Sequence, residues 1–122
     1  MGGDGGDLQR DGDFLTHDER YARTDEYLDV LYKLWEGSWE EDAVVQNRET
    51  GVYADPTKVH PIRHSGEHFT VPGAGLTAPS PQRTPLIFQA GASSRGQAFA
   101  GKHAEAVFIG GLRPDLTRFV TD

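Results

Sequence analysis

The sequence predicts an α/β fold organised around one βαβ unit at residues 85–111. Two apolar runs, at residues 86–88 and 106–109, flank a helical segment that starts with a turn at Gly91. Short continuous apolar runs joined by a helix are typical of parallel strands that are buried on both faces of a sheet. The turn lies where the first strand ends and the helix begins, and α/β proteins bind anions, above all phosphate, at such turns.

The strongest helix is predicted at residues 16–36, after a glycine- and aspartate-rich loop at residues 1–15. Thr16 and Glu19 have the spacing of a capping box, and Gly37 is expected to end the helix. Apolar side chains recur every three or four residues, which predicts one buried face. Its members are Tyr21, Leu28, Leu31, Tyr32 and Trp35.

Residues 38–84 form a long and mostly polar connection, which is unusual between a helix and a strand of a compact domain. We expect a small hairpin within this insertion, which starts at Val59, turns at Ser65 and Gly66, and returns along residues 68–71. After the βαβ unit, residues 112–122 are expected to begin a further helix.

Composition and length narrow the class of protein. The 122 residues indicate one domain, but a single βαβ unit is too little for a closed α/β domain, so we expect a small irregular domain or a piece of a larger one. The net charge of −7 disfavours nucleic acid as a partner. The absence of cysteine excludes disulfides and thiolate metal sites and fits a cytoplasmic protein. No segment has the apolar length of a membrane span.

The turn after the first predicted strand is one candidate anion site. Its backbone N–H groups and the hydroxyls of Ser93 and Ser94 suit a phosphate, and Arg95 adds positive charge. The alternative is an ordinary helix N-cap, in which one of the two serines satisfies the first turn.

The start of the long helix is a second candidate anion site. His17, Arg20 and Tyr21 lie within its first turns, so an imidazole, a guanidinium and a phenol gather near the positive end of the helix. A core tyrosine flanked by solvated charges is the alternative, and these three residues alone favour it.

Three histidines at four-residue spacing, His60, His64 and His68, have the pattern of metal ligands on a helix. Pro61 and Gly66 argue against a helix here, so we expect no metal site. No catalytic base is assigned, and the three histidines are only candidates.

Six sequence blocks occur in the order found in one family of flavoproteins. They are HDERYAR (17–23), LWEGSWEEDA (34–43), DPTKVH (55–60), HSGEHF (64–69), PSPQ (79–82) and QAGAS (89–93). With them the chain resembles the nitrilotriacetate and dibenzothiophene-sulfone monooxygenase branch of the bacterial-luciferase-like flavoproteins. The resemblance covers nearly all of the chain from about Phe14 onward.

The resemblance implies a TIM (β/α)8 barrel, of which residues 1–122 would be a central fragment with about two strands, two to three helices and a long insertion. It implies a two-component monooxygenase, in which reduced FMN from a separate flavin reductase and O₂ oxygenate a small organic substrate. Full-length members are expected to be homo-oligomers.

The resemblance also assigns the two candidate anion sites to one FMN phosphate. The residues it implies are Tyr21, with Arg20 and His17 adjacent, and the turn of Ala92, Ser93 and Ser94. The family usually has serine where Ala92 stands, so one hydroxyl is lost. Residues 1–13 hold no counterpart of the first half of the barrel, so we expect the isolated chain to be incomplete and inactive.

Two other classes of function remain open at this stage. One is a small non-catalytic α/β module that binds a phosphate-bearing ligand or a protein partner. The other is a degenerate gene product without a function.

Overall fold

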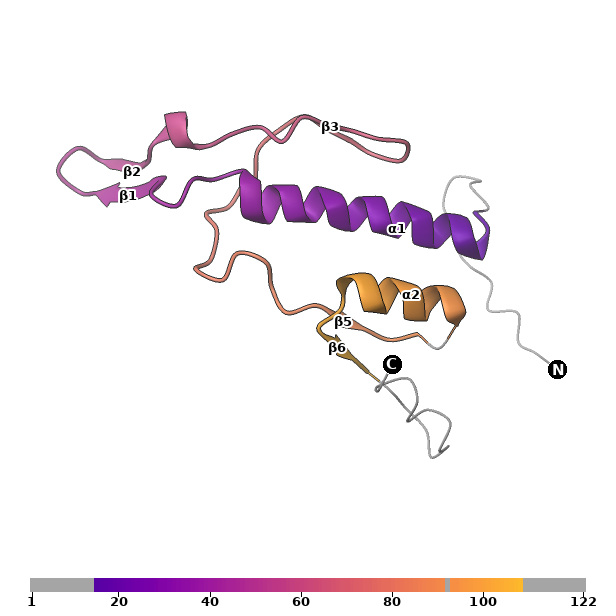
Figure 1. Cartoon of the computed structure of the whole chain (residues 1–122). Coiled ribbons are helices and arrows are strands. Elements are labelled where there is room, and N and C mark those ends of the chain that lie inside the picture. Colours follow the sequence, from indigo (N-terminus) through magenta and orange to yellow (C-terminus); the bar gives the residue numbers. More distant parts are fainter. Residues whose placement is uncertain (1–14, 92, 109–122) are drawn as a thin grey trace.

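Two α-helices and three two-stranded sheets form the structure in residues 15–91 and 93–108, which are the residues that the computed structural model describes. In chain order the elements are α1 (His17–Tyr32), the π-helical turn η1 (Lys33–Gly37), β1 (Val44–Asn47), β2 (Val52–Ala54), the 3-10 turn η2 (Pro56–Lys58), β3 (His64–Ser65), β4 (Thr70–Val71), β5 (Phe88–Gln89), α2 (Ser94–His103) and β6 (Ala106–Val107). Figure 1 shows α1 between the hairpin that contains β3 and the layer of α2, β5 and β6. None of the helices in these residues is long and apolar enough to cross a membrane.

The predicted capping box at the start of α1 is confirmed. The Thr16 hydroxyl accepts a hydrogen bond from the Glu19 backbone N–H at 3.2 Å, and the Glu19 carboxylate accepts one from the Thr16 N–H at 2.7 Å. The helix passes into the wider π-turn and ends at Gly37, as expected. Its apolar face is only half-buried, and Val30 is the one α1 residue that the described structure buries.

The predicted βαβ unit is also confirmed, because β5 pairs with β6 in parallel and α2 connects them. Phe88 lies opposite Ala106 and Gln89 opposite Val107. The expected burial on both faces is not found in the described residues, where Phe88 is 63% exposed and Phe108 74% exposed. Only α2 packs beside this strand pair in residues 15–91 and 93–108, so its other face stays open (Figure 1).

The insertion contains the expected hairpin, with β3 antiparallel to β4 and a turn closed by a bond from the Gly66 N–H to the Phe69 carbonyl. It also contains a second hairpin that the sequence analysis missed, formed by β1 and β2. The Asn47 side chain shapes the β1–β2 turn by accepting from the backbone N–H groups of Glu49 and Thr50.

Two adjacent carboxylates on α1 attach the helix to its neighbours on both sides. The Asp25 carboxylate lies 2.8 Å from Nε2 of His103, which belongs to α2. The Glu26 carboxylate lies 2.8 Å from Nε2 of His64, which belongs to β3. Glu26 also accepts from the backbone N–H groups of His68 at 2.7 Å and Phe69 at 3.1 Å, so it closes the turn of the β3–β4 hairpin onto α1.

The Glu26–His64 contact is buried and has a defined proton arrangement. The two side chains are 14% and 8% exposed. Lys33 Nζ lies 2.9 Å from His64 Nδ1, and a lysine ammonium can only donate. His64 Nδ1 therefore accepts, and Nε2 carries the proton that is donated to Glu26. The hydrogen bond from His64 lowers the pKa of Glu26; burial opposes this, and the bonds from the two hairpin amides lower it further.

Acid is expected to destabilise the attachment of the hairpin to α1. The folded chain holds the pKa of Glu26 below its ordinary value of 4.5, so the unfolded chain binds this proton more readily. The free energy of unfolding should therefore fall as the pH drops from 4.5 through the lower folded-state pKa. Urea unfolding at a series of pH values tests this. The free energy of unfolding of Glu26→Gln should fall less steeply over that range. An identical slope for the two proteins would contradict the lowered pKa of Glu26.

Candidate functional site

The N-terminus of α2 is the first part of the candidate site. Ser93 is its N-cap and accepts a hydrogen bond from the Gly96 N–H at 3.1 Å. The first turn of a helix presents free backbone N–H groups and a positive partial charge, which together attract anions. The Ser93 hydroxyl stands at this end and can also donate a proton to a bound oxygen.

The Tyr21 hydroxyl on α1 approaches the same point from across the helix pair. A Cβ atom placed on Gly96 would lie 2.8 Å from Tyr21 Oη and 3.1 Å from Ser93 Oγ. A Cβ on Gly91 would lie 3.4 Å from Tyr21 Oη and 3.3 Å from Gln89 Nε2. The two glycines thus leave the space in which the tyrosine hydroxyl, the serine hydroxyl and the glutamine amide converge.

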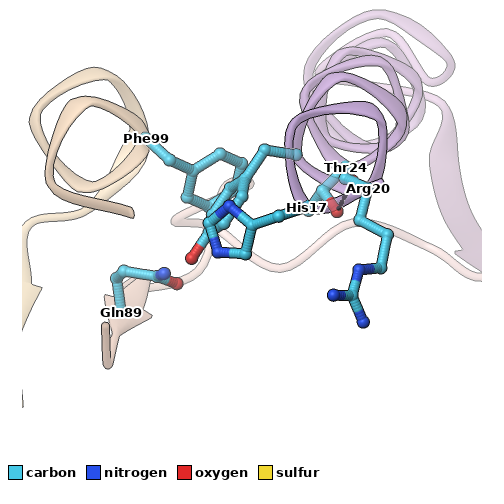
Figure 2. A pocket seen from close by; sticks show the side chains of 6 residues that line it. His17, Arg20, Thr24, Gln89 and Phe99 are labelled. Carbon is cyan, nitrogen blue, oxygen red and sulfur yellow. Dashed lines mark hydrogen bonds between the residues drawn. The ribbon is translucent and has the colours of Figure 1, made fainter. Parts of the chain in front are cut away.

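A pocket of ≈ 420 Å³ opens beside this convergence and shares Tyr21 and Gln89 with it, whereas Ser93 is not in its lining. Its lining residues come from α1, β5 and α2: His17, Arg20, Tyr21, Thr24, Gln89 and Phe99. Figure 2 shows Phe99 reaching from α2 towards His17 on α1, with Gln89 below them and Arg20 on the side of α1 away from α2. The pocket therefore has an aromatic wall and a polar rim.

Aromatic packing fixes the position of the Tyr21 ring. The ring lies 4.9 Å from the His17 ring and 5.6 Å from the Phe99 ring, with the Phe99 contact edge-on. Phe99 is only 6% exposed. Ring contacts at these distances are favourable, so the two neighbours hold the phenol in place with its hydroxyl beside the start of α2.

The structure brings together most of the residues predicted for the anion site. Tyr21, His17 and Arg20 line one pocket, and Ser93 lies next to the Tyr21 hydroxyl. Ser94 is the first residue of α2 and is exposed, outside the pocket lining. Ala92 falls outside the described residues. The charge expected from Arg95 is directed elsewhere, because its guanidinium lies 3.2 Å from Asp25.

Three lining residues were missed by the sequence analysis: Thr24, Gln89 and Phe99. Thr24 lies three residues after Tyr21, a spacing that places side chains on one face of a helix. Gln89 is the last residue of β5, and residues at the carboxyl end of parallel strands are common in α/β sites. Thr24 could thus have been proposed from its spacing to Tyr21, and Gln89 from its place at the end of the predicted strand.

The three histidines of the insertion take separate partners. His60 lies 3.1 Å from the Glu40 carboxylate, whereas His64 contacts Glu26 and Lys33. The His68 backbone N–H donates to Glu26. Within residues 15–91 and 93–108, no group of three or more His, Cys, Asp or Glu side chains is arranged to hold a metal ion.

The geometry defines a βαβ segment with a candidate anion site at the N-terminus of α2, beside a parallel strand pair. The chain belongs to the luciferase-like monooxygenase family, whose pattern it matches over residues 2–122. It is 59% identical over 108 residues to a long-chain alkane monooxygenase of Geobacillus thermodenitrificans, covering 88% of this chain and 24% of the relative. The chain thus spans about a quarter of the length of that relative.

Relatives from the branch named by the resemblance are also found. The dibenzothiophene-sulfone monooxygenase of Rhodococcus erythropolis is 53% identical over 102 residues, which cover 84% of this chain and 22% of the relative. The nitrilotriacetate monooxygenase component A of Aminobacter aminovorans is 42% identical over 99 residues, which cover 81% and 21%. The expected family is therefore confirmed.

Solved structures confirm the fold class. The crystal structure of a long-chain alkane monooxygenase superposes with a TM-score of 0.81 at 56% identity, over 94% of this chain and 26% of that one. A riboflavin lyase solved with modified FMN and riboflavin superposes with a TM-score of 0.78 at 48% identity, over 88% and 24%. The described elements are thus part of a luciferase-like TIM barrel, as expected.

Alanine at Gly96 is expected to destabilise the chain, although alanine normally favours a helix over glycine by about 1 kcal/mol. The added Cβ would lie 2.8 Å from Tyr21 Oη, and the packed phenol cannot move aside freely. Gly101→Ala in the same helix is the matched control, since a Cβ there meets nothing within 4 Å. The midpoint of thermal unfolding should rise in Gly101→Ala and fall in Gly96→Ala. Equal gains would show that Tyr21 is not held at α2.

Proposed function

We propose that the pocket between α1 and α2 binds the phosphate of FMN in a flavin-dependent monooxygenase. The observation that carries this proposal is the meeting of the Tyr21 and Ser93 hydroxyls beside Gly96, at the N-terminus of α2. Two hydroxyl donors and free helix amides are a suitable donor set for a phosphate monoester. We also propose that the whole protein is a flavin-dependent monooxygenase.

The donors around the pocket fit a phosphate group. Tyr21 and Ser93 would each donate a hydrogen bond to a phosphate oxygen, and the first-turn amides of α2 would add backbone donors. Arg20 and His17 line the same pocket and supply positive or donor groups at its rim. No acidic side chain lines this pocket in the described residues, so nothing there repels a dianion.

When bound, reduced FMN would supply the reaction with O₂ through which a small organic substrate is oxygenated. The residues of this chain would anchor the phosphate end of the cofactor and fix its orientation. Gln89 on β5 and Phe99 on α2 would limit the pocket on the side away from α1.

The names of two similar proteins support the choice of cofactor and partner. The riboflavin lyase structure contains modified FMN. The name of the Aminobacter relative, component A, indicates a system with a second component. We propose a separate flavin reductase as the partner that delivers reduced FMN to this protein, and a cytoplasmic location in keeping with the lack of cysteine.

Removing the hydroxyl of Ser93 or of Tyr21 should weaken the binding of FMN. It should not change the binding of riboflavin, which lacks the phosphate. Ser93→Ala and Tyr21→Phe are each expected to raise the Kd for FMN by about 10- to 100-fold, as one hydrogen bond to a charged group contributes about 1.5–3 kcal/mol. Quenching of flavin fluorescence gives both affinities. The titrations use the chain itself and a chimera in which it replaces the matching segment of the Geobacillus relative.

Thr16→Ala is the matched control for the lost helix cap. Both Thr16 and Ser93 are N-caps, and loss of either cap should cost about 1 kcal/mol of stability. Of the two caps, only Ser93 lies with the Tyr21 hydroxyl beside Gly96, so Thr16→Ala should leave the FMN affinity of the chimera unchanged. A wild-type chimera that binds FMN no more tightly than riboflavin would contradict the proposed phosphate site.

A further inference from the structure

We infer that Asp25 is a positioning residue for the phosphate site: it fixes α2 against α1, so that the N-terminus of α2 meets the Tyr21 hydroxyl. This inference rests on the proposed function. Asp25 is not among the residues that line the pocket. It acts through α2, and three side chains of that helix converge on its carboxylate: Arg95, Lys102 and His103.

One carboxylate contacts both ends of α2. Asp25 Oδ2 accepts from the Arg95 guanidinium at 3.2 Å, and Arg95 lies in the first turn of the helix. Asp25 Oδ1 accepts from His103 Nε2 at 2.8 Å and lies 3.6 Å from Lys102 Nζ, both in the last turn. Contacts at the two ends resist sliding and rotation of α2 along α1, which a single contact would allow.

The His103 end of this clamp is buried and continues to a second contact on α1. The His103 side chain is 2% exposed and that of Asp25 is 19% exposed. Because His103 Nε2–H donates to the carboxylate, Nδ1 is free to accept from the Tyr32 hydroxyl at 3.0 Å. Burial, together with the nearby charges of Asp29 and Glu105, raises the pKa of Tyr32, so its hydroxyl keeps the proton that it donates.

Asp25 stays ionised at neutral pH despite its surroundings. Burial raises the pKa of Asp25, but the hydrogen bond from His103 and the charges of Lys102 and Arg95 outweigh it and lower the pKa below the ordinary value. Asp25 thereby balances the cations of α2 that face it. It also keeps Arg95 at the helix pair instead of at the phosphate pocket.

The position of α2 matters because the site has little spare room. Asp25 stands four residues after Tyr21, so it lies one helical turn from the tyrosine that it would serve. The Tyr21 hydroxyl is so near Gly96 that a single added carbon would lie 2.8 Å from it. A shift of α2 along α1 would therefore change the spacing between the Tyr21 hydroxyl and Ser93 at the start of α2.

Asp25→Ala in the chimera should weaken FMN binding by about tenfold, the effect of one lost hydrogen bond to a charged group. The affinity for riboflavin should not change, because riboflavin has no phosphate to misplace. Asp25→Asn keeps one acceptor oxygen for His103, so its loss of FMN affinity should be smaller than that of Asp25→Ala. Glu26→Ala is the matched control: it removes the neighbouring carboxylate, which holds the β3–β4 hairpin and not α2, and should leave both affinities unchanged.

Amide hydrogen exchange without flavin gives an independent readout. In Asp25→Asn, the amides of Gly96 and Gln97, which bond to Ser93 at the start of α2, should exchange faster. In Glu26→Ala the faster exchange should appear in the β3–β4 hairpin instead. Unchanged exchange at the start of α2 in the Asp25 variants would overturn the inference, whatever the flavin does.

The binding results also separate the outcomes. Equal losses for FMN and riboflavin would assign Asp25 to stability alone and overturn the inference. A gain in FMN affinity would mean that the released Arg95 binds the phosphate, and would overturn it as well. A wild-type protein without preference for FMN would refute the proposed function, while hydrogen exchange would still decide whether Asp25 places α2.

Discussion

The attachment of α1 to its neighbours through Asp25 and Glu26 is the constraint on which the rest of this structure depends. Few apolar side chains are buried in the described residues: Val30, Ala43, Phe99 and Ala100. Apolar packing alone therefore does little to fix the relative positions of the elements. The two carboxylates act in opposite directions from one helix turn, with Asp25 bound to His103 on α2 and Glu26 bound to His64 on β3.

Such contacts specify an arrangement more strongly than they stabilise it. Exposed ion pairs contribute about 0–1 kcal/mol, whereas removal of one partner from a buried pair costs about 3–5 kcal/mol. His103 and His64 are both buried, so a misplaced helix or hairpin would leave a carboxylate or an imidazole without a partner. The consequence at the pocket is a fixed distance between the Tyr21 hydroxyl and the start of α2.

The sequence was most informative where the signal was local. The capping box of Thr16 and Glu19 involves residues three apart, and the parallel strands of the βαβ unit follow from two apolar runs. Tyr21 and Ser93 could also be named as candidate anion-site residues, because both lie at helix starts, where anions bind. That these two residues face one phosphate was implied only by family resemblance, since they belong to different elements, and their approach at Gly96 is known only from the structure.

Long-range and weakly patterned features were beyond the sequence. Asp25 and His103 are 78 residues apart, and among many charged side chains nothing in one sequence selects this pair. The β1–β2 hairpin was missed because its strands are only four and three residues long, although Asn47 and Gly51 are turn residues. The exposure of Phe88 could not be predicted from residues 86–88 alone, because an apolar run predicts burial without naming the segment that covers it.

Two-dimensional NMR of the chimera with isotope-labelled residues 93–97 and Tyr21, titrated with FMN and then with riboflavin, tests the central claim most directly. The account predicts that FMN shifts the NMR signals of the backbone amides at the start of α2 and of the Tyr21 ring. Riboflavin should leave these signals unchanged. Equal shifts with both flavins, or none at these residues with FMN, would contradict a phosphate site between α1 and α2.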